Sequence, residues 1–141
     1  MKKLFYISYF VVLSFSQAVA QDPIIDSLKL KLKNAKYDTT RVKLLSELSE
    51  VCEVEDILLY AEPCVKICKR AISSNVPSKK LYLTHLSGAY NNIGFLAQNQ
   101  GKIIKATQYY QKCLAIQVQI QDKNGIANSL NNPCLFTKSI N

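Results

Sequence analysis

Apolar and small residues recur along residues 82–97 with the spacing of one helical face. They follow one another at steps of one, three or four positions, which is typical of an amphipathic α-helix. The members are Tyr82, Leu86, Ala89, Tyr90, Ile93, Gly94 and Ala97. A second run with this spacing carries Ile103, Ala106, Tyr110, Cys113 and Leu114. Gly101 lies between the two runs and suits the left-handed turn that ends a helix, so the pattern predicts two antiparallel helices.

Gly94 lies inside the first of these helices, where glycine costs about 0.8–1.0 kcal/mol relative to alanine. Such a cost is tolerable where the missing side chain lets a partner helix approach closely. We therefore expect Tyr110 and Ala106 of the second helix to pack against Gly94.

The same pattern occurs twice more. Upstream, Leu45, Leu48, Ser49, Cys52, Ala61, Val65 and Cys68 match Tyr90, Ile93, Gly94, Ala97, Ala106, Tyr110 and Cys113 without a gap. Downstream, Leu130-Asn131-Asn132 matches Tyr90-Asn91-Asn92 at a step of 40, with a turn expected over residues 122–125. In the upstream unit, Thr39 or Thr40 is expected to cap the first helix. Pro63 predicts a kink in the second helix, or a later start of that helix.

Both ends of the chain's repeats depart from the pattern. Asp22 as cap and Pro23 at the first helical position predict a short helix that covers the open end of the stack. Its apolar residues are Ile24, Ile25, Leu28, Leu30 and Leu32. At the other end, Pro133 and Cys134 interrupt the third unit, so residues 133–141 are expected to be irregular. That ending is either a degenerate cap or a truncation, and truncation is favoured because repeat arrays usually need about three units.

The central unit resembles a tetratricopeptide repeat. The residues that carry the resemblance are Tyr90, Ile93, Gly94, Ala97, Gly101, Ala106, Tyr110, Cys113 and Leu114. Ala97 replaces the family's aromatic and Cys113 replaces its alanine, but both positions stay apolar. The step of 40 exceeds the usual 34 and resembles the lengthened repeats of exported regions of bacterial signalling proteins. The resemblance implies an all-α short solenoid with a capping helix in residues 21–37 and tetratricopeptide-like repeats in residues 38–132.

The resemblance also implies a binding surface. In this family, the first helices of the repeats line the concave side and bind extended or helical peptides. The positions that match here are Asn91, Phe95, Gln98, Asn99, Asn128 and Asn131. Asparagine suits this role because its amide carries both donors and an acceptor. The alternative is an ordinary hydrophilic surface with Phe95 packed into a neighbouring unit.

Residues 1–20 have the composition of a secretory signal peptide. Lys2 and Lys3 precede an apolar stretch that runs to about Phe15, and Ala18-Val19-Ala20 provides a cleavage site. An uncleaved membrane anchor is the alternative, but a bilayer span needs about 20 apolar residues. We therefore expect export to the periplasm or medium, with no transmembrane segment after cleavage.

The charge of the chain bears on the class of partner, and the number of cysteines bears on disulfide bonding. The chain has a net charge of +8, and removing residues 1–20 leaves 16 basic and 10 acidic residues. The basic residues are spread out, which favours a solvated surface, with attraction to acidic partners as the alternative. Nucleic acid is not an expected partner. Five cysteines are an odd number, so we expect most of them to be small buried residues without a disulfide.

The sequence offers little chemistry. His85 is the only histidine, so no metal set or catalytic triad is apparent. The acidic cluster Glu47, Glu50, Glu53, Glu55 and Asp56 lacks the spacing of a calcium loop and fits a solvated helix face. No cofactor or small-molecule substrate is indicated. We expect an exported, non-enzymatic module that binds a protein or peptide; the alternative is the sensory input region, or a truncated remnant, of a bacterial histidine kinase or transcriptional regulator. A thiol-based enzyme is disfavoured because no base lies beside a thiol.

Overall fold

In the computed structural model of the protein, residues 22–135 are described, and every regular element among them is a helix. The predicted signal peptide and residues 136–141 lie outside this range. The α-helices are α1 (Pro23–Asn34), α2 (Asp38–Val51), α3 (Ile57–Ser73), α4 (Lys79–Asn99), α5 (Ile103–Gln119) and α6 (Lys123–Leu130). Two short 3₁₀ turns are η1 (Val54–Asp56) and η2 (Pro133–Leu135). The all-α prediction is confirmed.

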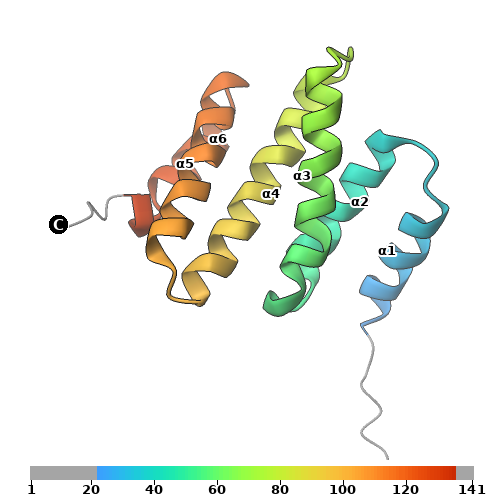
Figure 1. The fold of residues 1–141 in the computed structure, drawn as a ribbon, viewed down its shortest axis with the longest axis horizontal. Coiled ribbons are helices and arrows are strands. Elements are labelled where there is room, and N and C mark those ends of the chain that lie inside the picture. The colour runs from blue at the N-terminus through green and yellow to red at the C-terminus, as the bar shows by residue number, and fades with distance from the viewer. Residues whose placement is uncertain (1–21, 136–141) are drawn as a thin grey trace, which may run out of the picture.

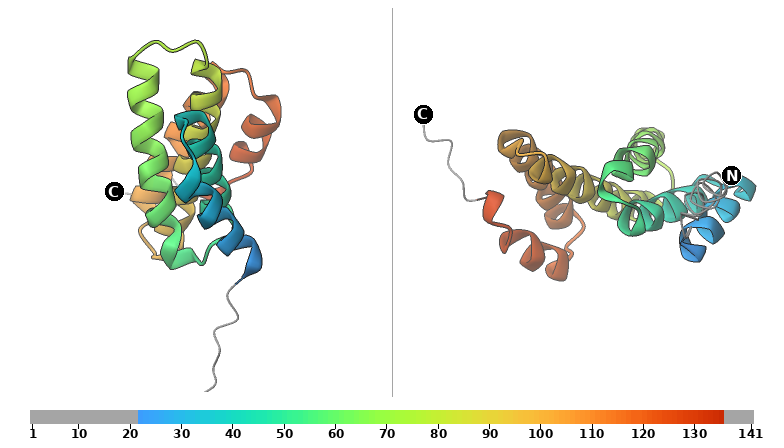
Figure 2. Two further views of the ribbon diagram at one scale, coloured as in Figure 1. Left: turned by 90° about the vertical axis from the view of Figure 1, so that its right-hand side faces the viewer. Right: turned by 90° about the horizontal axis from the view of Figure 1, so that it is seen from below.

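Helices α1 to α5 lie side by side in chain order along the longest axis of the molecule, and α6 lies beside α5 (Figure 1). Each helix packs against the next one in the chain, and α2 also packs against α4. Seen from below, the row zigzags, with α6 turned back beside α5 (Figure 2). Within residues 22–135, none of the helices is long and apolar enough to cross a bilayer.

The first helix begins as its sequence predicts. The Oδ1 atom of Asp22 accepts a hydrogen bond from the backbone N–H of Ile24 at 2.9 Å, and Pro23 occupies the first turn. Leu28 is buried against the core, with Ile25 and Leu32 packed beside it. The remaining two apolar residues of this helix, Ile24 and Leu30, are 60% and 62% exposed. Helix α1 therefore covers the end of the stack with one narrow stripe.

The predicted caps Thr39 and Thr40 are wrong. Helix α2 begins at Asp38, so both threonines lie in its first turn, and no side chain caps it. The backbone N–H of Arg41 already donates to the carbonyl of Tyr37 at 3.0 Å. The carboxylate of Asp38 accepts from Arg70 of α3 at 2.7 Å and suits the positive end of the helix dipole. Helix α2 thus begins earlier than expected, at a residue that also pairs with Arg70 of α3.

Helix α3 runs through Pro63 from Ile57 to Ser73. The expectation of a later start is therefore wrong, because η1 leads directly into the helix. Pro63 is exposed, so its ring displaces no core side chain.

The turn between α4 and α5 matches its prediction. Gly101 has φ of 71°. Its N–H donates to the carbonyl of Gln98 at 2.9 Å, and the N–H of Lys102 donates to the carbonyl of Ala97 at 2.9 Å. This pair of bonds is the usual end of a helix that stops at a glycine. Helix α5 ends with the same two bonds, but there Gln121 occupies the left-handed position with φ of 59°.

The predicted contact between Gly94 and Tyr110 is confirmed. A Cβ atom added to Gly94 would lie 2.9 Å from Cε1 of Tyr110. Tyr110 is only 4% exposed, and its hydroxyl donates to Oε1 of Gln98 at 2.8 Å. Ala106 is fully buried beside it. Glycine at position 94 thus makes room for an aromatic ring of the partner helix.

The cysteines and the C-terminal residues complete the core. None of the five cysteines, all within the described range, forms a disulfide, and four of them are buried. Cys134 of η2 packs with Tyr110, Ala106 and Ala97, and its carbonyl accepts from the Thr107 hydroxyl at 2.9 Å. The part of the tail that is described, residues 133–135, therefore folds back onto α5.

Candidate functional site

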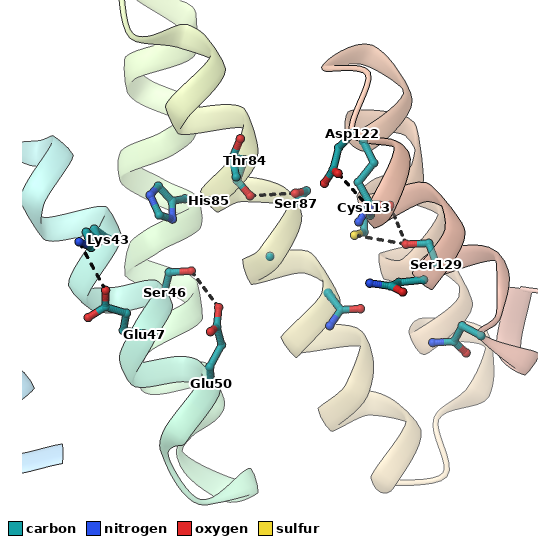
Figure 3. A pocket seen from close by; sticks show the side chains of 16 residues that line it. Lys43, Ser46, Glu47, Glu50, Thr84, His85, Ser87, Cys113, Asp122 and Ser129 are labelled. Carbon is teal, nitrogen blue, oxygen red and sulfur yellow. Dashed lines mark hydrogen bonds and ion pairs between the residues drawn. The ribbon is translucent and has the colours of Figure 1, made fainter. Parts of the chain in front are cut away.

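A groove lies among α2, α4 and α6 and encloses a cavity of about 580 Å³ (Figure 3). Helix α2 supplies Lys43, Ser46, Glu47 and Glu50 to its lining, and α4 supplies Thr84, His85, Ser87, Gly88 and Asn91. The other wall consists of Cys113, Gln117, Asp122, Gly125, Asn128, Ser129 and Asn132.

Helical spacing explains this lining. The groove residues of α2 lie at positions 43, 46, 47 and 50, and those of α4 include the same series at 84, 87, 88 and 91, which places each set along one face of its helix. Gly88 also lines the groove, beside Ser46. A Cβ atom there would meet only Oγ of Ser46, at 3.7 Å.

The groove contains two of the six residues expected from the resemblance. Asn91 and Asn128 both line it, from α4 and α6, and both are exposed. Neither side chain has a hydrogen bond to another residue of the range 22–135. Their amides are thus available to a ligand.

The other four expected residues lie outside the lining. Phe95 is 46% exposed, and its carbonyl accepts from Nδ2 of Asn99 at 3.1 Å. The side-chain oxygen of Gln98 is already engaged by the Tyr110 hydroxyl. Asn131 is exposed just beyond the end of α6.

The wall formed by α5 and α6 contains residues that the sequence alone did not single out. Oε1 of Gln117 accepts from the Ser129 hydroxyl at 2.6 Å, and this hydroxyl lies 4.0 Å from Sγ of Cys113. Asp122 caps α6, because its Oδ1 accepts from the N–H of Gly125 at 3.0 Å. The turn expected over residues 122–125 is therefore the cap and first turn of a helix. The sequence signal for this helix start is Asp122, which lies three residues before Gly125 as a capping residue does.

The groove carries more negative than positive charge. Glu47, Glu50 and Asp122 line it, and among residues 22–135 Lys43 is the only Lys or Arg that does so. Lys43 and Glu47 approach to 3.9 Å, but both are exposed, so the pair adds little stability. Glu50 accepts from the Ser46 hydroxyl at 3.3 Å. The groove thus differs in sign from the chain as a whole.

His85 is half-buried at the edge of the groove and faces the charges of α2. Burial lowers the pKa of His85; Glu47 opposes that shift, and Lys43 adds to it. The imidazole is therefore neutral at pH 7 and can serve as a hydrogen-bonding group.

The thiol of Cys113, which lines the groove, is protonated at neutral pH. Burial raises its pKa, although the hydrogen bond with Ser129 lowers it in part. Outside the groove lining, the hydrogen bond between Cys64 and Cys68 raises the pKa of Cys68 and lowers that of Cys64. Across residues 22–135, no three His, Cys, Asp or Glu side chains are grouped so that they could hold a metal ion. The chemistry that the groove offers is hydrogen bonding and charge.

Comparison of the chain with protein-family models, with curated proteins and with solved structures found no match.

Proposed function

We propose that this protein is a non-enzymatic interaction module that binds an extended segment of another protein in the groove of α2, α4 and α6. The observation that carries the proposal is the pair Asn91 and Asn128. The two side chains line one groove from different helices, and neither has a hydrogen bond to another described residue. A peptide backbone offers a donor and an acceptor at each residue, which an asparagine amide can match.

The proposed architecture is a short stack of tetratricopeptide-like helix pairs. Its support is that five of the seven matched positions are buried in both pairs, whereas Cys52 and Val65 are only partly buried. Ala61 and Ala106 are both fully buried, and Cys68 and Cys113 are 0% and 1% exposed. The packing of α2 against α4 brings the first helices of successive pairs together on the groove side. Within the proposal, residues 1–20 direct the module out of the cytoplasm.

The charge of the groove also favours a particular kind of peptide segment. With its surplus of carboxylates, the groove suits a segment that carries basic rather than acidic side chains. The proposed role involves no catalysis. The neutral imidazole of His85 and the protonated thiol of Cys113 act as polar groups in the lining of the groove.

A binding assay with paired variants tests the proposal. Peptides selected from a random display library on the full chain are labelled, and their Kd values are measured by fluorescence polarisation. Asn91→Ala combined with Asn128→Ala should weaken binding about 30-fold, from ~1 kcal/mol for each lost side chain. The control combines Asn99→Ala with Asn131→Ala, two residues of the same type outside the groove. The control should bind within about twofold of the original chain. Equal losses in both variants, or a greater loss in the control, would place the site elsewhere.

A further inference from the structure

The start of α5 exposes two isoleucines between two lysines. Residues 102–105 read Lys-Ile-Ile-Lys, directly after the left-handed Gly101. Ile104 is 74% exposed and Ile103 is 40% exposed. A single exposed apolar residue is common on protein surfaces, but here two adjacent ones lie at the tip of a helix hairpin, with a basic residue on each side.

The patch continues along the outer face of α5. Lys105, Gln108 and Lys112 recur at steps of three and four residues, and with Tyr109 and residues 101–104 they line a shallow cavity of about 700 Å³. The Nζ atom of Lys112 lies 4.9 Å from the centre of the Tyr109 ring and 5.7 Å from that of Tyr90. These cation–π contacts hold the ammonium group at the surface.

Charge along the chain is strongly segregated. Residues 63–121 contain eight basic residues and no Asp or Glu. The ion pairs of the described helices are Lys43–Glu47 and Arg70–Asp38, so Lys102, Lys105 and Lys112 are not paired with carboxylates. The acidic η1 turn lies at the same end of the stack as the α4–α5 turn, beside α3 (Figure 1). The carboxylates of η1 repel an anionic partner near α3. Such a partner is therefore favoured beside α5, where the lysines lie.

We propose that this face of α5, defined as residues 101–105, 108, 109 and 112, docks on the surface of an anionic lipid bilayer. Lys102, Lys105 and Lys112 would contact lipid phosphates, and Ile104 would enter the boundary between headgroups and acyl chains. Anionic lipids attract basic residues near the membrane surface. Burial of exposed apolar side chains in the interface adds favourable free energy. A shallow cavity beside a projecting turn fits a flat partner better than an enclosed peptide. The proposal does not depend on the groove, since α5 contributes other residues, Cys113 and Gln117, to that site.

A fluorescent reporter tests the proposal directly. The chain contains no tryptophan, so Ile104→Trp introduces a single one. Its emission should shift to the blue with vesicles of phosphatidylglycerol and phosphatidylcholine and stay unchanged with phosphatidylcholine alone. High salt should reduce the shift, because it screens exposed charges. In this background, Lys102→Glu with Lys105→Glu should lower the partition coefficient about 30-fold or more, the equivalent of ~1 kcal/mol for each lysine.

Two matched controls keep the test specific. Leu59→Trp places the reporter at a residue of α3 that is 63% exposed, and it should show no shift. Both reporters carry the same residues 1–20, so any insertion of that segment affects them alike. Lys79→Glu with Lys80→Glu reverses two charges at the start of α4 and should preserve the Ile104→Trp shift. An equal shift at Leu59→Trp, equal losses in the two charge variants, or no shift with anionic vesicles would overturn the proposal. A shift with polyglutamate but none with vesicles would also overturn it and would indicate an acidic protein partner.

Discussion

Gly94→Ala tests the packing of the second helix pair. The added Cβ atom would lie 2.9 Å, 3.0 Å and 3.3 Å from three ring atoms of Tyr110. The ring cannot easily withdraw, because it is 4% exposed and its hydroxyl is bonded to Gln98. Overpacking of this kind costs about 1–3 kcal/mol, and alanine regains about 0.8–1.0 kcal/mol in helix propensity. We therefore expect a net loss of up to about 2 kcal/mol.

Gly88→Ala is the matched control on the same helix. A Cβ atom there makes only an ordinary contact of 3.7 Å with the Ser46 hydroxyl oxygen. The gain in helix propensity should then raise the free energy of unfolding by ~1 kcal/mol. Urea titration followed by circular dichroism measures both changes, and thermal melting should separate the two variants by several °C, at about 4 °C for each kcal/mol.

A double-mutant cycle identifies the clash itself. Tyr110→Leu removes the ring that the new Cβ atom meets, so Gly94→Ala should cost less in that background than in the original chain. The close contact between Gly94 and Tyr110 would be contradicted if the Gly94→Ala variant were as stable as the Gly88→Ala variant. It would also be contradicted if Gly94→Ala lowered the free energy of unfolding equally with and without Tyr110→Leu.

Three further changes test local features. Gln121→Gly should stabilise the protein by ~1 kcal/mol in urea titration, because residue 121 has φ of 59° and glycine removes the steric cost of that conformation; an equal gain from Gln121→Ala would contradict this reason. Asp22→Ala should cost ~1 kcal/mol and speed hydrogen exchange in α1, whereas Thr39→Ala should be close to neutral, because Asp22 caps α1 and no side chain caps α2. The free energy of unfolding should fall as the pH drops through about 6.5, since the unfolded chain protonates His85 before the folded chain does, and the fall should level off below the lowered pKa of the folded state. In pH-dependent urea titrations, His85→Gln should flatten this part of the curve, and an unchanged slope would count against the burial of the imidazole.

Local signals in the sequence were sufficient for much of the fold. The helical faces, the turn at Gly101 and the start at Asp22-Pro23 each depend on residues close together in the chain, so pattern alone predicted them. The contact between Gly94 and Tyr110 was also predictable, because a glycine inside a helix suggests a close neighbour and the paired helix supplied one ring at the right position.

Features set by distant contacts were not predictable. The start of α2 involves the ion pair between Asp38 and Arg70, which are 32 residues apart. The groove joins residues from 43 to 132, and no local pattern marks Gly88 or Ser129 as part of it. The resemblance predicted that Phe95 and Asn99 bind a peptide, but neither of them lines the groove. Helix α6 has only 8 residues against 21 in α4, so it leaves the last turns of α4 without a facing wall.

NMR titration shows at residue level whether a peptide segment binds in the groove of α2, α4 and α6. Isotope-labelled protein is titrated with a selected peptide, and the shifts of backbone and asparagine side-chain amides are followed. The largest changes are expected at Asn91, Asn128 and Ser87, which line the groove. Changes concentrated at Phe95–Asn99 or on the outer face of α5, with the groove amides unmoved, would contradict it.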